Sequence, residues 1–246
     1  MPVSQTQEAN KKALGLMGWA SHLLLLILML SLAVWAARWG WAEVLVAEPR
    51  NVMDTWRTGR TMPPDEELDR LNGLLARANS LNSKNADIAF DQGRFAEWRA
   101  QKYPLWTDAA YKYREEAISH FKRALDIRPS SGMLWVHLAN SQVLNRQLYS
   151  GGMDALEKAS ILAPLEIPVQ QRVIWLGFSQ WKVMDDELRG RVREIIEDAL
   201  VYHQHDLVVK AMVDFELENE FADLLADEHL QLLQKELAAR NRRKRH

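Results

Sequence analysis

The sequence predicts an all-α protein in which one apolar N-terminal helix precedes a domain of paired helices. Three observations lead to this prediction. A long uncharged stretch lies near the N-terminus, apolar residues recur every three or four positions over most of the remaining chain, and a set of packing residues repeats further along. With 246 residues, the chain can hold one anchor segment and one domain with a sizeable core.

Composition indicates a folded chain and excludes several kinds of site. The hydrophobic fraction is 48% and the charged fraction is 26%, a balance typical of globular proteins. The formal net charge of −2 creates no overall field that would attract nucleic acid, so we expect no nucleic-acid partner. The absence of cysteine excludes disulfides, thiol catalysis and thiolate metal sites.

The N-terminal region predicts a membrane anchor. Residues 1–12 form a short polar tail, and no charged side chain occurs in residues 13–37. About 20 apolar residues cross a bilayer as a helix, so residues 13–37 are predicted to form a transmembrane helix. Trp35, Trp39 and Trp41 cluster at its end, where indole rings favour the headgroup region. A cleaved signal peptide is the alternative, which the length of the apolar run and the lack of a clean cleavage site disfavour.

Residues 38–64 are predicted to form a juxtamembrane linker, in which the part up to Val52 is the exit of the helix and the part from Thr58 to Asp65 is the connection to the domain. They carry mixed charges, show little periodicity and end in Pro63 and Pro64. Basic residues lie on both sides of the predicted span, so the charge rule leaves the orientation of the chain open.

Residues 65–239 are predicted to form the helical domain. Acidic residues follow Pro64, and negative charge suits the start of a helix because the N-terminal end of the helix dipole is positive. Leucines spaced by three and four positions continue this first helix to about Leu81. The same spacing predicts further helices at 86–102, 106–127, 135–148 and 153–162, near 173–181, from 185 onwards, and at 207–217 and 221–237.

A repeated packing pattern defines the type of helical domain. Ala117, Phe121 and Ala124 share one helix face, where two small residues admit a neighbouring helix and the phenyl ring fills the gap. The packing alanine and the proline that ends the helix both recur 35 residues later, at Ala159 and Pro164, close to the tetratricopeptide repeat (TPR) period of about 34. We therefore predict a TPR-like helical-hairpin solenoid, whose structural repeat positions are Ala117, Phe121, Ala124, Pro129, Trp135, Leu138, Ala159 and Pro164.

The chain ends in a predicted basic tail, residues 240–246, in which five of seven residues are Lys or Arg. One interpretation is a solvated terminus that blocks self-association. The other is a tail that contacts acidic lipid headgroups or an anionic partner.

No combination of residues predicts catalysis, a metal or a cofactor. His203 and His205 are two positions apart and would point to different faces of a helix. Gly151 and Gly152 lack the spacing and the lysine that cradle phosphates. We therefore expect a non-catalytic protein without a cofactor.

Stacked helix pairs curve into a concave face that suits an extended segment of a partner protein. The first helices of the repeats line this face. We expect the partner contacts to be exposed side chains of these helices, namely His137, Asn140, Ser141, Gln180 and Trp181, the last because indole rings also stack on sugars.

The layout resembles the VpsP-type proteins of bacterial exopolysaccharide biosynthesis clusters. The resemblance covers the order of tail, span, linker and repeat array over the whole chain, and the run from Ala117 to Trp135 within residues 110–200. It implies a single-pass inner-membrane protein whose helical domain lies in the periplasm. Such a protein assists polymer assembly or export through contacts with other envelope assembly proteins. The matched residues are structural, so no functional site is carried over.

Two alternative functions remain open from the sequence. One is a membrane-tethered periplasmic chaperone or quality-control factor for translocated proteins, and the other is a polysaccharide-binding protein that uses exposed tryptophans. An apolar open groove favours the chaperone, a row of exposed aromatic residues favours sugar binding, and a polar groove favours a dedicated assembly partner.

Overall fold

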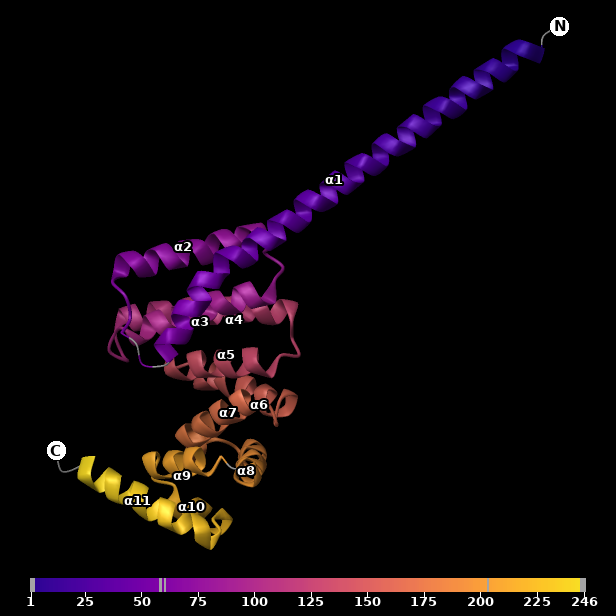
Figure 1. The fold of residues 1–246 in the computed structure, drawn as a ribbon. Coiled ribbons are helices and arrows are strands. Elements are labelled where there is room, and N and C mark those ends of the chain that lie inside the picture. Colours follow the sequence, from indigo (N-terminus) through magenta and orange to yellow (C-terminus); the bar gives the residue numbers. More distant parts are fainter. Residues whose placement is uncertain (1–2, 58, 60, 203, 244–246) are drawn as a thin grey trace.

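The structure is a computed structural model that describes residues 3–57, 59, 61–202 and 204–243, and every regular element in this part of the chain is helical. One long helix projects away from a stack of shorter helices (Figure 1). Its outer end lies far from the stack, and the last described helix lies at the opposite end of the stack (Figure 1). The predicted all-α class with one long apolar N-terminal helix is confirmed.

The long helix, α1 (Val3–Arg57), has two parts with different surroundings. Between Ser21 and Trp41 its side chains are exposed. The stretch Ser21–Trp56 contains a window with a mean hydropathy of 2.0, and by length and composition this helix can cross a membrane. The part from Ala42 to Trp56 instead buries one face against the domain.

Residues 38–57 do not form the predicted linker, because they continue α1. Their buried side chains recur at helical spacing and pack with α2 (Asp65–Leu81) and α3 (Ala86–Gln101) in one apolar cluster. The mixed charges that suggested a linker make contacts with the domain. Arg50 Nε donates to Asp91 Oδ2 at 2.5 Å, and Asp91 is only 3% exposed. The buried residues of this part of α1 are Ala42, Val46, Pro49, Met53 and Trp56.

Helices that are neighbours in sequence also pack together in space. The first such pair is the end of α1 with α2. Three further pairs are α3 with α4 (Asp108–Ile127), α5 (Gly132–Leu144) with α6 (Met153–Leu162), and α7 (Ile167–Gln180) with α8 (Asp186–Val201). Successive pairs contact each other through α2 and α3, α4 and α5, and α6 and α7.

The C-terminal part of the domain departs from the predicted helices. α9 (His205–Asp214) packs on α11 (Asp227–Arg243). The single helix predicted at 221–237 is divided, because the backbone at Leu225 is extended and separates α11 from α10 (Glu218–Phe221) and a short 3₁₀ turn. Two further short elements, Leu148–Gly152 and Trp181–Val183, follow α5 and α7.

Side-chain caps explain where several helices begin. The Asn85 side chain accepts hydrogen bonds from the backbone N–H groups of Asp87 and Ile88 at the start of α3. Thr107, Ser131 and Asp185 cap α4, α5 and α8 in the same way. Each cap satisfies amide donors that lack a partner within the helix, which stabilises the helix by about 1 kcal/mol.

The structural repeat positions lie in the core or next to helix ends. Ala117, Phe121, Ala124, Leu138 and Ala159 are buried. The half-buried Trp135 donates its Nε1–H to the Pro129 carbonyl at 2.7 Å. Pro129 and Pro164 each follow shortly after the last residue of a helix, as predicted.

The predicted basic tail is not a free segment over residues 240–243, because these residues belong to α11. Arg240 Nη1 donates to the Val213 carbonyl at 3.0 Å and pairs with Glu218. Arg243 Nη2 lies 3.2 Å from Asp214 Oδ1. These contacts fasten the end of α11 to α9 and to the segment that follows it. Residues 244–246 lie outside the described part of the chain.

Gly93 allows α3 to approach α4 closely. A Cβ atom built on Gly93 would overlap the ring of the fully buried Phe121. This glycine would weaken an isolated helix, but here its missing side chain makes room for the aromatic ring. Gly73 on α2 provides a contrast, because its Cβ position is open space.

Replacing Gly93 with alanine should therefore destabilise the domain. We expect Gly93→Ala to lower the free energy of unfolding by about 1–3 kcal/mol through overpacking against Phe121. The matched Gly73→Ala should leave stability unchanged or raise it by up to about 1 kcal/mol, because alanine favours a helix. Thermal unfolding of the two purified variants followed by circular dichroism measures both effects. Equal melting temperatures would contradict the close packing of α3 on α4.

Candidate functional site

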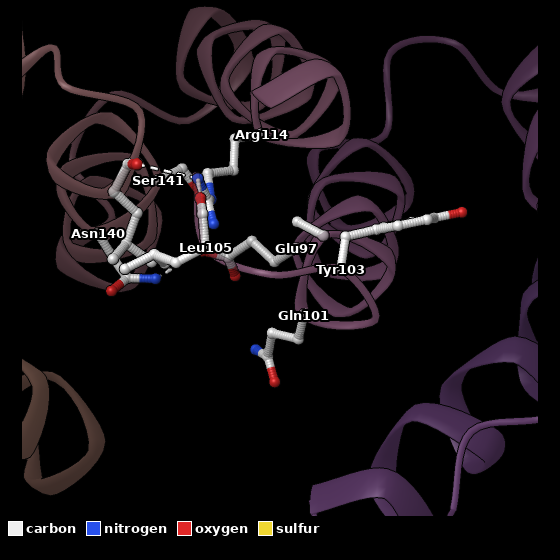
Figure 2. A pocket seen from close by; sticks show the side chains of 9 residues that line it. Glu97, Gln101, Tyr103, Leu105, Arg114, Asn140 and Ser141 are labelled. Atoms are coloured by element: carbon white, nitrogen blue, oxygen red, sulfur yellow. Dashed lines mark hydrogen bonds between the residues drawn. The ribbon is translucent and has the colours of Figure 1, made fainter. Parts of the chain in front are cut away.

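A cavity of about 230 Å³ with a mixed polar and apolar lining lies where α3, α4 and α5 meet. Side chains of Glu97 and Arg114 reach from α3 and α4 into the space beside α5, whereas the Tyr103 ring extends away from this cluster (Figure 2). The lining combines charged, amide and aliphatic groups from three helices and the loop after α3. It consists of Glu97, Ala100, Gln101, Tyr103, Leu105, Arg114, Asn140, Ser141 and Leu144.

Glu97 contacts three polar side chains at the cavity. Its Oε1 accepts hydrogen bonds from Asn140 Nδ2 at 3.1 Å and from Ser141 Oγ at 2.8 Å. Its Oε2 lies 2.6 Å from His137 Nδ1. The Glu97 side chain is only 12% exposed, so these donors replace the water that a carboxylate otherwise needs. One residue of α3 thereby binds three residues of α5.

The protonation states of Glu97 and His137 follow from this arrangement. Burial opposes ionisation of Glu97, but His137, Arg172 and Asn140 outweigh it and hold the pKa of the carboxyl below its ordinary value. Burial lowers the pKa of His137 by more than the neighbouring Glu97 raises it, and the charges of Arg172 and Arg94 act in the same direction as burial. The 2.6 Å contact is a hydrogen bond in which His137 Nδ1–H donates to the Glu97 carboxylate.

Arg114 places a buried positive charge at the cavity wall. The residue is 4% exposed, and burial lowers the pKa of its guanidinium. Nη1 donates to the carbonyls of Leu105 at 2.7 Å and Leu144 at 3.0 Å. Among the residues that the structure describes, no hydrogen bond or ion pair occupies Nε or Nη2. These two nitrogens are available to an acceptor that enters the cavity.

The geometry suits binding better than hydrolysis. A serine nucleophile is activated by a histidine that takes its proton, and a carboxylate in turn orients that histidine. Here the hydroxyl of Ser141 and the imidazole of His137 both point to the same Glu97 carboxylate. The cavity instead offers hydrogen-bond donors and acceptors on a partly apolar surface, which suits a short polar chain segment. No group of three or more potential metal ligands occurs in the described residues.

The structure separates the predicted contact residues into two groups. His137 and Ser141 are buried, so they do not form the exposed surface that the sequence predicted. Their bonds to Glu97 hold α5 against α3. Asn140 is half-buried at the same cluster and lines the cavity.

Gln180 and Trp181 lie at the end of α7, outside this cavity. Gln180 Nε2 donates to Ser179 Oγ at 3.1 Å. The Trp181 ring lies 4.7 Å from that of Phe221, centroid to centroid, and packs against the main core. The indole therefore contributes to packing of α7 on the C-terminal helices.

The sequence reasoning missed Glu97 and Arg114. Glu97 is separated from its partner His137 by 40 positions, and no local pattern relates them. Arg114 did carry a signal, because it occupies the apolar face of α4 together with Ala110, Ala117 and Phe121. A charged residue on a buried helix face indicates a specific polar environment.

A comparison of this chain with protein-family models and with curated proteins found no match. The site is therefore interpreted from its own geometry.

The buried His137 predicts that the domain loses stability on acidification. The unfolded chain binds a proton at this position with a pKa of about 6.5, whereas the folded chain binds it only at lower pH. Stability is therefore complete above pH 6.5 and falls below it, by no more than about 1.4 kcal/mol per pH unit for this group. Glu97 acts in the same direction below its ordinary pKa of about 4.3.

Melting temperatures measured between pH 7.5 and pH 5 test this expectation. The wild type should lose stability over this range, and His137→Gln should lose less because the titrating group is gone. His120, whose pKa burial lowers to about 4, should contribute a residual slope in both proteins. Identical slopes for the wild type and His137→Gln would contradict a neutral, buried His137.

Proposed function

We propose that this chain is a non-catalytic, membrane-anchored adaptor that holds a segment of a partner protein near the membrane. The observation that carries the anchoring is the exposed apolar surface of α1. Its leucine, isoleucine and methionine side chains between Leu23 and Leu32 are each more than 50% exposed. A bilayer would cover this surface, whereas water would leave it a strong aggregation hazard.

We infer a TPR-like solenoid for the domain from the order of its helix contacts. Successive helix pairs pack on each other along the chain. Phe121 of α4 lies with its ring 5.9 Å from that of Phe90 on α3 and 5.4 Å from that of His137 on α5. It thus fills the gap between one pair and the next, which is the role that the repeat pattern predicts. Ala117 and Ala124 on the same face are fully buried, which supports the same assignment.

The cavity between α3, α4 and α5 is the best candidate for the partner site. Gln101 at its rim is exposed, Asn140 is half-buried, and Arg114 presents two unoccupied donors. These polar groups stand on a largely apolar lining, which suits an amphipathic partner segment with backbone carbonyl or carboxylate oxygens. A cavity of about 230 Å³ holds one short segment, whereas a chaperone with varied clients requires a larger open apolar surface.

The biological setting rests on the resemblance to VpsP-type proteins. In that setting the domain lies in the periplasm of a bacterial cell, and the partner belongs to the machinery that assembles or exports an exopolysaccharide. Anchoring raises the local concentration of the adaptor around such machinery and so strengthens weak contacts.

Photo-cross-linking in the native host tests the partner site. A benzoylphenylalanine placed at Gln101 should yield one discrete protein adduct, because this position borders the cavity. The same group at Lys122, which is exposed on α4 outside the cavity, should yield none. Arg114→Met should reduce the Gln101 adduct several-fold. Many adducts at Gln101 would favour the chaperone alternative, and equal adducts at the two positions would contradict a specific site.

A topology measurement tests the compartment separately. A reporter that is active only in the periplasm and a reporter that is active only in the cytoplasm are each fused after His246. We expect periplasmic activity, because the resemblance implies a translocated domain. Cytoplasmic activity would remove the exopolysaccharide role and direct the search towards cytoplasmic partners.

A further inference from the structure

The α2–α3 loop returns to α1 at the end of the apolar stretch. A depression of about 260 Å³ lies between them, lined on α1 by Trp35, Arg38 and Trp39 and on the other side by residues 81–84. The two indole rings lie 3.8 Å apart, centroid to centroid, and both are exposed. Indole rings at the end of a membrane-spanning stretch favour the boundary between acyl chains and headgroups.

Two cations without partners face this depression. Arg38 lies on α1 and Lys84 lies in the loop, and both side chains are exposed. Neither forms an ion pair or a hydrogen bond with any residue in the described part of the chain. Most other arginines near the start of the domain do have acidic partners, such as Arg50, Arg70 and Arg94. No carboxylate lines the depression, so its positive charge is not compensated.

The depression continues into an apolar groove on α1. This groove is lined by Ile27, Leu30 and Val34, with Ser31 between them, and it shares Trp35 and Arg38 with the depression. The apolar residues are spaced by three and four positions, so they form one face of the helix that leads to the two cations. The apolar face suits an acyl chain, and the basic residues at its end suit a phosphate.

We propose that α1 and the α2–α3 loop bind one anionic glycerophospholipid, with its phosphate between Arg38 and Lys84. Arginine and lysine form strong charge-assisted hydrogen bonds with phosphate oxygens. Ser83 and Asn82 add neutral hydrogen-bonding groups that suit a glycerol headgroup. A headgroup with its own positive charge suits the site less, because two uncompensated cations oppose it. This inference rests on the membrane anchoring proposed above.

The bound lipid would fix the height of the domain above the membrane. The loop that carries Lys84 connects α2 to α3, and Glu97 of α3 lines the cavity between α3, α4 and α5. A lipid held between α1 and this loop would therefore join the membrane surface to the element that positions the partner site.

Native mass spectrometry of the full chain, released from nanodiscs that contain equal phosphatidylglycerol and phosphatidylcholine, tests this proposal. We expect the wild type to retain phosphatidylglycerol preferentially. Arg38→Gln with Lys84→Gln should lower that preference by about tenfold, because each basic residue near the surface attracts anionic lipid. The control Lys122→Gln with Lys235→Gln removes the same charge from exposed positions outside the depression and should keep the preference.

The remaining outcomes distinguish a lipid phosphate from a soluble phosphate. They also distinguish failure of the lipid site from failure of the membrane anchoring. Equal retention of both lipids, or an unchanged preference in the Arg38 and Lys84 variant, would overturn the lipid site. Displacement of the lipid by excess inorganic phosphate would also overturn it and would assign the depression to a soluble anion. Release of the chain from native membranes by alkaline carbonate would overturn both the membrane anchoring and the lipid site. If the chain stays in the membrane but shows no lipid preference, only the lipid site is overturned.

Discussion

The structure depends on one constraint, which is that a single helix serves as both the apolar N-terminal segment and the first helix of the domain. α1 is continuous from Val3 to Arg57, and its second part buries Ala42, Val46, Met53 and Trp56 among α2 and α3. A helix is stiff because its turns are hydrogen-bonded to one another. The exception in α1 is Pro49, which has no N–H to donate and lies in the part that packs on the domain. Any membrane that holds the first part of α1 therefore also constrains the position of the domain, because the same helix continues into the core.

A short series of contacts connects α1 to the cavity between α3, α4 and α5. Arg50 of α1 pairs with the buried Asp91 of α3, and Glu97, which lies six residues further along α3, binds three residues of α5. Burial raises the pKa of Asp91 by more than Arg50 and Arg94 lower it. A buried ion pair contributes less to net stability than to a defined geometry, and here it fixes the rotation of α1 on α3.

Local patterns predicted the local structure well. The bounds of α2 and α6, the uncharged part of α1 and the buried faces of Ala117 and Phe121 follow from helical spacing and turn residues. The errors arose where distant segments meet. Residues 38–57 carry the mixed charges that are typical of a linker, but α2 and α3 cover their apolar face and they form a helix. Similarly, His137 and Ser141 are polar residues that the sequence places on the surface of α5, but they are buried because they pair with Glu97, about 40 positions earlier. Spacing along one helix carries no information on such partners.

Hydrogen exchange of the full chain in nanodiscs measures the continuity of α1 most directly. If α1 is one helix that enters the core, the amides of residues 42–56 exchange slowly, with protection similar to that of α2 and α3, because opening them requires unfolding of the domain. Residues 38–41 should then show protection that continues from the apolar stretch into the domain. Rapid exchange across residues 38–57 would show a flexible linker between two independent parts and would contradict the account.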